Sequence, residues 1–499
     1  MSPKTQAKLI RLALLPLTAI LLLASGCSSS TTTNGMQSSE TGPAFLVGTD
    51  APLAGVVSMQ VTFEDVELTN GTSTTGTLVQ GTPTVDFARY NGLQGLVDMV
   101  DVPAGTYTGV TFVISSGTVS WLNTSGGGAP TISSAPAAFS TTTVTVQLPN
   151  SLVVGDKTPP VGVRLDFDLA KSIQTSGGQI LTNGSGDVEV VPTFDITTVA
   201  RGDAGAHIDE FVGGLVSGPT STTEPSSFVI QGPHGENFTI NTSSTTAWDS
   251  CSSSATPAST CLSQLQTDGT SAVVAVAGEF DPSDQTLDAD EVAILTDSKF
   301  YAGGLVTYVS PSSGQATAMD FYVRGVLPSD LSEVPLGGIA QVNITGNENY
   351  GIYWMHNALT QLLFNADALT PGQEITVGGA DPTANPFDVK RIHLHNWGYN
   401  GTIVAGSENA GANAVGTNGT FTMTVKGFAG QVVSSNVTVY LGPQCDYRYG
   451  LSSFSDLTDG ATVRVVGILL KNQSNGKLVL LARHIDGSDL TDMTTTASQ

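Results

Sequence analysis

The chain has 499 residues, 43 of them acidic and 18 basic, so its formal charge at pH 7 is −25. This excess of carboxylates argues against a nucleic-acid-binding protein, whose affinity comes mostly from Lys and Arg beside phosphates, and against electrostatic docking on anionic lipids. Hydrophobic residues make up 40% of the chain, which excludes global disorder, and at roughly 150 residues per domain the length predicts about three or four domains.

The first 26 residues have the pattern of an export signal. Lys4, Lys8 and Arg11 precede an apolar run from residue 12 to residue 23, and the small residues that a signal peptidase accepts follow it. The run is too short to cross a hydrocarbon core, which needs roughly 20 residues. We therefore expect the chain to be exported rather than to span a membrane through this segment.

The end of this signal, Ala24-Ser25-Gly26-Cys27, resembles the lipobox of bacterial lipoproteins. The resemblance implies that Cys27 becomes the acylated, palmitate-bearing first residue of the mature chain and anchors it to the cell envelope. In that family a residue other than Asp after the cysteine, here Ser28, implies delivery to the outer membrane. Ordinary secretion with an incidental cysteine is the alternative.

Residues 27–43 are rich in Ser, Thr and Gly and predict a flexible tether. From 44 to 200 the pattern is that of successive strands. Met59, Val61 and Phe63 alternate with polar residues, the period of a sheet with one buried face, and similar alternation recurs at 110–114, 144–148 and 161–167. Short strands separated by Gly and Pro predict an antiparallel β-sandwich over 44–200.

Several motifs in this region resemble the bacterial domain of unknown function 4382. They are Gly48-Thr49-Asp50-Ala51-Pro52, the strand Val61–Leu68, the stretch from Val85-Asp86-Phe87 to Asn91-Gly92, and Val102-Pro103-Ala104-Gly105-Thr106-Tyr107. The resemblance implies an exported β-sandwich. It implies no activity, because none is established for that family.

After His207 the sequence repeats with a period of about 90 residues. Each unit opens with a strand (213–216, 303–306, 401–404) and has a helix-compatible stretch (259–265, 356–363, 452–457) before its last strands. This order predicts three tandem OB-like β-barrels over 208–297, 298–396 and 397–487, followed by a disordered tail over 488–499. The units also resemble the domain of unknown function 5666, which occurs in tandem behind export signals.

Two kinds of residue suggest cross-links or metal ligands. Cys251 and Cys261 lie ten apart in one Ser-rich segment of an exported chain, which predicts a local disulfide and leaves Cys445 without a partner. His393 and His395 alternate on a predicted strand, so both rings face one side and could supply two metal nitrogens. A surface pair is the alternative, since the sequence fixes no third ligand.

Carboxylates cluster at two places. Five acidic residues between Asp281 and Glu291 could bind calcium, although they fail the EF-hand spacing and favour a solvated turn. Asp166 and Asp168 share a face of another strand. They lack an acid-base companion, so we interpret them as the solvated side of the sheet.

Aromatic residues recur just before each helix-compatible stretch. They are Trp248 in the first unit, Tyr353 and Trp354 in the second, and Tyr447 and Tyr449 in the third. If exposed together they could stack on sugar rings, because OB-like barrels bind oligosaccharides. Core packing is the alternative.

None of the searched hydrolase, zinc, phosphate-binding or dinucleotide motifs occurs in a suitable context, so we do not expect an enzyme. The sequence favours a noncatalytic envelope lipoprotein without a cofactor that binds a ligand, for example a carbohydrate, or serves as a spacer. Its expected partners are the membrane, through the lipid, and a polysaccharide or an envelope protein. The alternatives are a metal-dependent hydrolase using His393 and His395 and a calcium-stabilised adhesin.

Overall fold

The computed structural model describes residues 40–487 apart from 51, 52, 54, 72, 124–128, 156–160, 177, 178, 204, 205, 233–236, 250, 252–257, 282, 285, 297–299, 328–333, 354–361, 380–385, 412–418 and 426–434. The predicted signal peptide, Cys27, most of the tether and the tail over 488–499 lie outside the described residues. Within the described part, no helix combines the length and apolar character needed to cross a bilayer.

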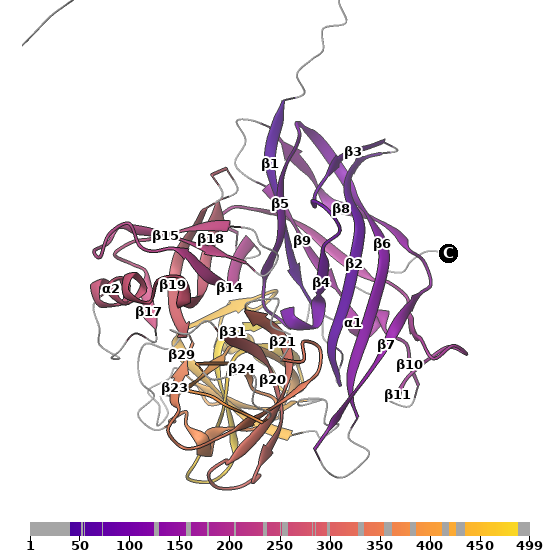
Figure 1. Cartoon of the computed structure of the whole chain (residues 1–499). Coiled ribbons are helices and arrows are strands. Elements are labelled where there is room, and N and C mark those ends of the chain that lie inside the picture. The colour runs from indigo at the N-terminus through magenta and orange to yellow at the C-terminus, as the bar shows by residue number, and fades with distance from the viewer. Residues whose placement is uncertain are drawn as a thin grey trace, which may run out of the picture. The chain divides into compact units, whose positions relative to one another are not determined.

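The N-terminal region is a β-sandwich (Figure 1). One sheet has the order β13-β9-β1-β5, and the other has the order β12-β7-β6-β2-β3 with β4 on β2 and β8 on β6. Its elements are β1 (Thr41–Thr49), β2 (Val56–Asn70), β3 (Ser73–Thr77), β4 (Thr84–Asp86), η1 (Phe87–Tyr90), β5 (Gly95–Pro103), β6 (Gly105–Asn123), β7 (Thr131–Phe139), β8 (Thr143–Val154), β9 (Val161–Phe167), α1 (Leu169–Ser172), β10 (Thr175–Ser176), β11 (Gln179–Ile180), β12 (Val188–Val190) and β13 (Phe194–Ala200).

The predicted alternation follows from this packing. Met59, Val61 and Phe63 are fully buried between the sheets, where Phe112 and Phe194 stack with ring centroids 4.6 Å apart. The sheet begins earlier than the sequence indicates, because residues 41–43 pair with 101–103 as the first residues of β1. The end of the predicted tether is therefore strand.

Three small barrels follow the sandwich. Barrel 1 contains β14 (His207–Ser217), β15 (Ser226–Gln231), β16 (Asn237–Thr242), β17 (Ala247–Asp249), α2 (Ala258–Asp268), η3 (Gly269–Ser271), β18 (Val273–Asp281) and β19 (Thr286–Thr296). Barrel 2 contains β20 (Tyr301–Ser310), β21 (Ala318–Leu327), β22 (Ile339–Asn343), β23 (Asn349–Ile352), η4 (Ala366–Ala368), β24 (Glu374–Gly378), β25 (Phe387–Asp388) and β26 (Arg391–His395). Barrel 3 contains β27 (Trp397–Ile403), β28 (Thr420–Val425), β29 (Ser435–Arg448), η6 (Phe454–Asp456), β30 (Thr462–Lys471) and β31 (Leu478–Asp486).

The same pairing recurs in all three barrels. The first long strand pairs with the second and fourth, the second pairs with the third, and the fourth pairs with the fifth, all antiparallel. In barrels 1 and 3 the third strand then pairs with the fifth in parallel, as β16 with β19 and β29 with β31. In barrel 2 the third strand, β22, pairs in parallel with the short strand β25, which precedes the fifth strand, β26. This order is that of an OB-like barrel, so the predicted all-β fold with a sandwich and small barrels is confirmed.

Glycine is required where two strands of a barrel cross closely. A Cβ atom at Gly304 would lie 1.8 Å from the carbonyl oxygen of Tyr322, and one at Gly467 would lie 1.9 Å from that of Leu481. Both positions coincide with shifts of strand register. Only a residue without a side chain fits there, which explains the recurrent Gly in the repeats.

The sandwich contacts every barrel. Phe45 of β1 lies in the buried cluster of barrel 1. Arg324 Nε of barrel 2 donates a hydrogen bond to the carbonyl oxygen of Val57 at 3.1 Å, and Asn91 Nδ2 donates to the carbonyl oxygen of Gly398 in barrel 3 at 2.8 Å. The barrels are thus docked on the sandwich as well as linked to it.

The barrels also contact one another. Arg391 of β26 donates to a carbonyl oxygen of β19 at 3.3 Å, and Gln373 Nε2 of barrel 2 donates to the carbonyl oxygen of Leu469 in barrel 3 at 3.0 Å. Arg483 Nη1 of barrel 3 donates to the carbonyl oxygen of Asp209 in barrel 1 at 3.5 Å. Each of the four modules therefore contacts the other three, and the described residues form one compact unit.

Candidate ligand sites

The aromatic residues predicted as a sugar platform do not form one exposed surface. Tyr353 is completely buried, so the prediction is wrong for this residue. Trp248 and Tyr447 are half-buried against the cores of barrels 1 and 3, and Tyr449 lies beneath a guanidinium of the sandwich. Trp354 lies outside the described residues. The rings mainly serve packing, because a strand that closes a small barrel buries its large side chains.

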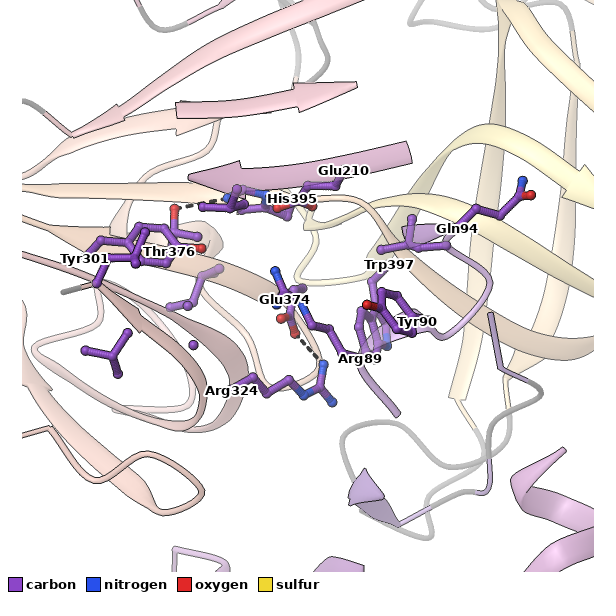
Figure 2. Close-up of a pocket in the computed structure, with 17 residues that line it drawn as sticks. Arg89, Tyr90, Gln94, Glu210, Tyr301, Arg324, Glu374, Thr376, His395 and Trp397 are labelled. Carbon is purple, nitrogen blue, oxygen red and sulfur yellow. Dashed lines mark hydrogen bonds and ion pairs between the residues drawn. The ribbon is translucent and has the colours of Figure 1, made fainter. Parts of the chain in front are cut away.

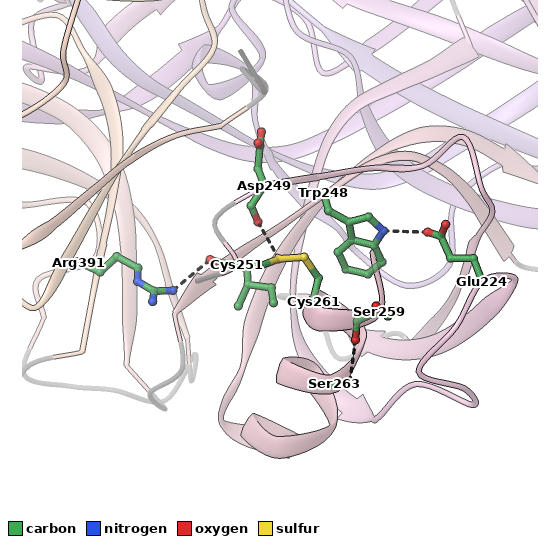
Figure 3. Close-up of a disulfide and its surroundings, with 9 residues drawn as sticks. Glu224, Trp248, Asp249, Cys251, Ser259, Cys261, Ser263 and Arg391 are labelled. Atoms are coloured by element: carbon green, nitrogen blue, oxygen red, sulfur yellow. Dashed lines mark hydrogen bonds between the residues drawn. A yellow bond between two sulfur atoms is a disulfide. The ribbon is translucent and has the colours of Figure 1, made fainter. Parts of the chain in front are cut away.

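Cys251 and Cys261 form a disulfide that joins the loop after β17 to α2 (Figure 3). The indole nitrogen of Trp248 next to it donates to Glu224 Oε1 at 2.9 Å. Cys445 is a free, half-buried thiol, and burial raises its pKa to about 12. This thiol is therefore protonated and unreactive at neutral pH.

Replacing Cys251 and Cys261 together by Ser should lower the free energy of unfolding by about 2–3 kcal/mol, because the loop of about ten residues gains freedom in the unfolded chain. Urea unfolding followed by tryptophan fluorescence would measure the loss. Cys445→Ser is the matched control and should leave the midpoint nearly unchanged. Equal shifts in the two variants would contradict a stabilising role for the cross-link.

The two predicted metal ligands are buried on β26. His395 Nε2 lies 3.0 Å from Thr376 Oγ1, and His395 Nδ1 lies 3.1 Å from Glu210 Oε1 of barrel 1. Burial holds the pKa of His393 well below its usual range. Neither residue is on the surface, so the surface-pair alternative is wrong. Among the described residues, no group of three or more His, Cys, Asp or Glu side chains could hold a metal ion.

The acidic segment after β18 is not a free cluster of carboxylates. Arg201 forms ion pairs with Asp281 and, at 2.7 Å, with Asp288. Glu291 is buried on β19, outside the turn. Asp284, Asp288 and Asp290 are exposed, as expected for a solvated turn, and a cation from the end of the sandwich neutralises two of the acids.

Asp166 and Asp168 are both buried, so the prediction that they face solvent is wrong. The reason is that both faces of β9 are covered. One face packs in the core of the sandwich, and barrel 3 approaches the strand through the Arg164–Tyr449 contact at 5.1 Å. Asp168 caps α1, accepting a hydrogen bond from the backbone N–H of Lys171 at 2.9 Å.

A charged pocket lies where the four modules meet. Figure 2 shows its side chains gathered around a small space of about 50 Å³. The sandwich contributes Arg89, barrel 1 contributes Glu210, and barrel 2 contributes Arg324, Glu374 and His395. Trp397 of barrel 3 closes one side. Such a concentration of charge is unusual in a chain of which only 12% of residues are charged.

The carboxylates of this junction pocket each lie beside a basic side chain, Glu210 beside His395 and Glu374 beside Arg324. Arg324 Nη1 lies 2.9 Å from Glu374 Oε2, and the Arg324 guanidinium stacks on the Trp397 ring at 4.2 Å from its centroid. Burial raises the pKa of Glu374 despite this arginine. Burial would also raise the pKa of Glu210, but the neighbouring His395 and Arg89 outweigh it and hold that pKa below its usual range.

A second buried network connects barrel 1, barrel 3 and the sandwich around Asp209. Its Oδ2 accepts a hydrogen bond from the backbone N–H of Gln94 at 2.9 Å, and its Oδ1 lies 3.5 Å from His207 Nδ1 and 3.9 Å from Arg483 Nη2. Burial would raise the pKa of Asp209, but the bond to His207 and the charge of Arg483 hold it far below its usual range. Asp209 is therefore ionised and fully buried.

A larger space than the junction pocket is a cleft of about 640 Å³ between β5 of the sandwich and barrel 1. Phe211 of β14 is half-buried in its wall and meets Phe238 of β16 edge-on, with ring centroids 4.8 Å apart. Gln80, Asp98 and Asn237 add amide and carboxylate groups. Asp98 accepts hydrogen bonds from the backbone N–H groups of Gln80 and Met99 at 2.6 and 2.7 Å, so its side chain is held in place. An adjoining hollow of about 380 Å³ shares two of these residues.

Sequence reasoning missed both the junction pocket and the cleft. One signal was available for the pocket: isolated charges interrupt apolar strands, as Arg324 does in Phe-Tyr-Val-Arg-Gly-Val and Glu210 does before Phe-Val. Both of these charges lie at contacts between modules, whereas Glu64 and Glu189, which also lie inside strands, are exposed. No local pattern identifies the cleft, because its walls come from segments more than 100 residues apart.

The comparisons with known proteins concern mainly the sandwich. Residues 45–184 match the family described as "Domain of unknown function (DUF4382)", which confirms the resemblance of the N-terminal domain. No curated protein matches the chain. One solved structure, titled "drosophila Unr CSD456", is similar at 10% identity over 56% of this chain and 97% of that chain, with a TM-score of 0.12. A score this low carries no argument about fold or function.

Proposed function

We propose that this chain is a noncatalytic cell-envelope lipoprotein that binds an uncharged carbohydrate segment in the cleft between the sandwich and barrel 1. The observation that carries the proposal is the cleft itself. Its volume falls within the range of small-molecule sites, roughly 300–1,000 Å³. Phe211 offers an aromatic ring for a sugar face, while Gln80 and Asn237 offer amides for hydroxyl groups.

Binding is favoured over turnover by the chemistry of this wall. Asp98 is the only acidic or basic side chain among the described residues that line the cleft, and it already accepts two backbone hydrogen bonds. Glycoside hydrolysis needs a pair of carboxyl groups. The lipid anchor at Cys27, delivery to the outer membrane and the resemblance of the barrels to the domain of unknown function 5666 belong to the same proposal and rest on the sequence.

The alternatives receive less support. A spacer gains reach when its repeats contact only their neighbours, whereas each module here contacts the other three. The calcium-stabilised adhesin loses its basis because Arg201 occupies the acidic segment. The metal-dependent hydrolase rests on two histidines, one of which is hydrogen-bonded to Thr376 and lies 3.1 Å from Glu210.

The test is binding of the purified chain to a panel of neutral oligosaccharides, measured by calorimetry. Phe211→Ala should weaken binding at least tenfold, because burying a phenyl ring contributes about 1.5–3 kcal/mol. Phe139→Ala removes another half-buried phenyl ring, outside the cleft, and should leave affinity unchanged. Failure of the wild-type chain to bind any member of the panel, or equal binding by Phe211→Ala, would overturn the proposal.

A further inference from the structure

One arginine of the junction pocket takes no part in an ion pair there. Arg324 is paired with Glu374, and His395 Nδ1 lies 3.1 Å from Glu210 Oε1. Arg89, from η1, lines the same space, and within the described part of the chain its guanidinium has no ion pair shorter than 4.0 Å and no hydrogen bond. Figure 2 shows Arg89 beside Glu374 and Arg324 in the middle of the pocket.

A guanidinium in such a place favours an anion. Its N–H groups can donate to an acceptor that enters the pocket, and a guanidinium donates most strongly to an anion. Glu210 and Glu374 line the same space, so a dianion would meet more repulsion there than a monoanion.

The size and walls of the pocket restrict the anion further. A volume of about 50 Å³ accommodates roughly three to five water-sized atoms, which is the size of acetate or propionate. Leu93, Val212 and Ile375 supply apolar wall from three different modules. An alkyl group gains contact with this wall, whereas a bare inorganic anion does not.

We infer that the junction pocket binds a short aliphatic monocarboxylate, with its carboxylate on Arg89 and its alkyl group against Leu93, Val212 and Ile375. The forked donors of an arginine match the two oxygens of a carboxylate. This inference does not depend on the proposed function, because the cleft is lined by other residues. It assigns the chain a second ligand of a different chemical class.

The experiment is calorimetric titration of the full chain with sodium formate, acetate, propionate and hexanoate, with sodium chloride at matched ionic strength as the reference. Acetate and propionate should bind one per chain with millimolar dissociation constants, as expected for four or five heavy atoms. Hexanoate should bind at least tenfold more weakly because the space is too small. Formate should bind more weakly than propionate because it has no alkyl group.

Arg89→Gln should weaken acetate binding at least tenfold, and Arg89→Lys should weaken it less, since Lys keeps the charge without the fork. Arg391→Gln removes a half-buried guanidinium at the interface of barrels 1 and 2, outside this pocket, and should change the affinity less than twofold. If Arg89→Gln does not fold, as judged by circular dichroism, Arg89→Lys decides the question. Absence of saturable binding by the wild-type chain, equal binding of chloride and acetate, or unchanged affinity in the Arg89 variants would each overturn the inference.

Discussion

Replacing Asp209 by Ala should lower the free energy of unfolding by about 3–5 kcal/mol, the largest loss that we expect from a single side chain in this protein. Removing one partner of a buried ion pair leaves the other charge uncompensated. Here the substitution removes a carboxylate 3.9 Å from the buried guanidinium of Arg483 and the acceptor of the hydrogen bond from the backbone N–H of Gln94. Urea unfolding at pH 7 would measure the change.

The matched control is Asp290→Ala. Asp290 also contacts His207, with 3.1 Å between Oδ2 and Nε2, but its side chain is 70% exposed. Exposed ion pairs contribute little, so the loss should stay below about 0.5 kcal/mol. Comparable losses in the two variants would show that the buried network around Asp209 does not hold the modules together.

Replacing Asp486 by Asn should instead stabilise the protein at pH 7, by about 1–3 kcal/mol. Burial raises the pKa of Asp486 to about 6, although Arg464 and Arg448 oppose the shift. The folded state therefore binds the proton more tightly than the unfolded chain, in which an Asp titrates near 4. Its contribution to stability is present below pH 4 and is lost as the pH rises through 6. Asn imitates the protonated form and has no such loss.

The measurement is the free energy of unfolding from pH 4 to pH 8 for both proteins. The difference between the variant and the wild type should grow between about pH 4 and 6 and then level off. Asp290→Ala is again suitable as a control, since the difference between that variant and the wild type should not grow over this interval. Parallel profiles for Asp486→Asn and the wild type would contradict burial as the cause of the raised pKa.

The sequence was sufficient for the type of fold because its signals are local. Alternation at Met59, Val61 and Phe63 needs only a sheet with one buried face. The first strands of barrels 1 and 2 share the sequence Gly-Gly-Leu-Val, although Gly304 has no room for a side chain and Gly214 has open space around it. Because the pattern repeats, the same order of strands could be predicted for all three units. The exact start of β1 was missed, because Thr41 is held by pairing with Pro103 rather than by its own propensity.

The sites were not predictable in the same way, because they arise from docking. Tyr353 precedes a helix-compatible stretch as the other aromatic residues do, but contact between barrels 1 and 2 buries it. Asp166 alternates like a surface residue, but β9 is covered on both faces. Arg89 and Glu210 lie 121 positions apart in the sequence and line one pocket only because η1 and β14 come together in the folded chain. Local sequence patterns carry no information about contacts between modules that are distant in the sequence.

The mutual contacts of the four modules bear on how the chain can be made. Polypeptides emerge from ribosomes and export channels N-terminus first, so the sandwich and barrel 1 are available before β31. Until Arg483 arrives, Asp209 and Gln94 lack part of the network that closes around them. A product that stops before residue 483 lacks the contact of Arg483 with Asp209 and part of the pairing of β31 with β29 and β30. We therefore expect the last strand to complete the buried contacts between barrels 1 and 3.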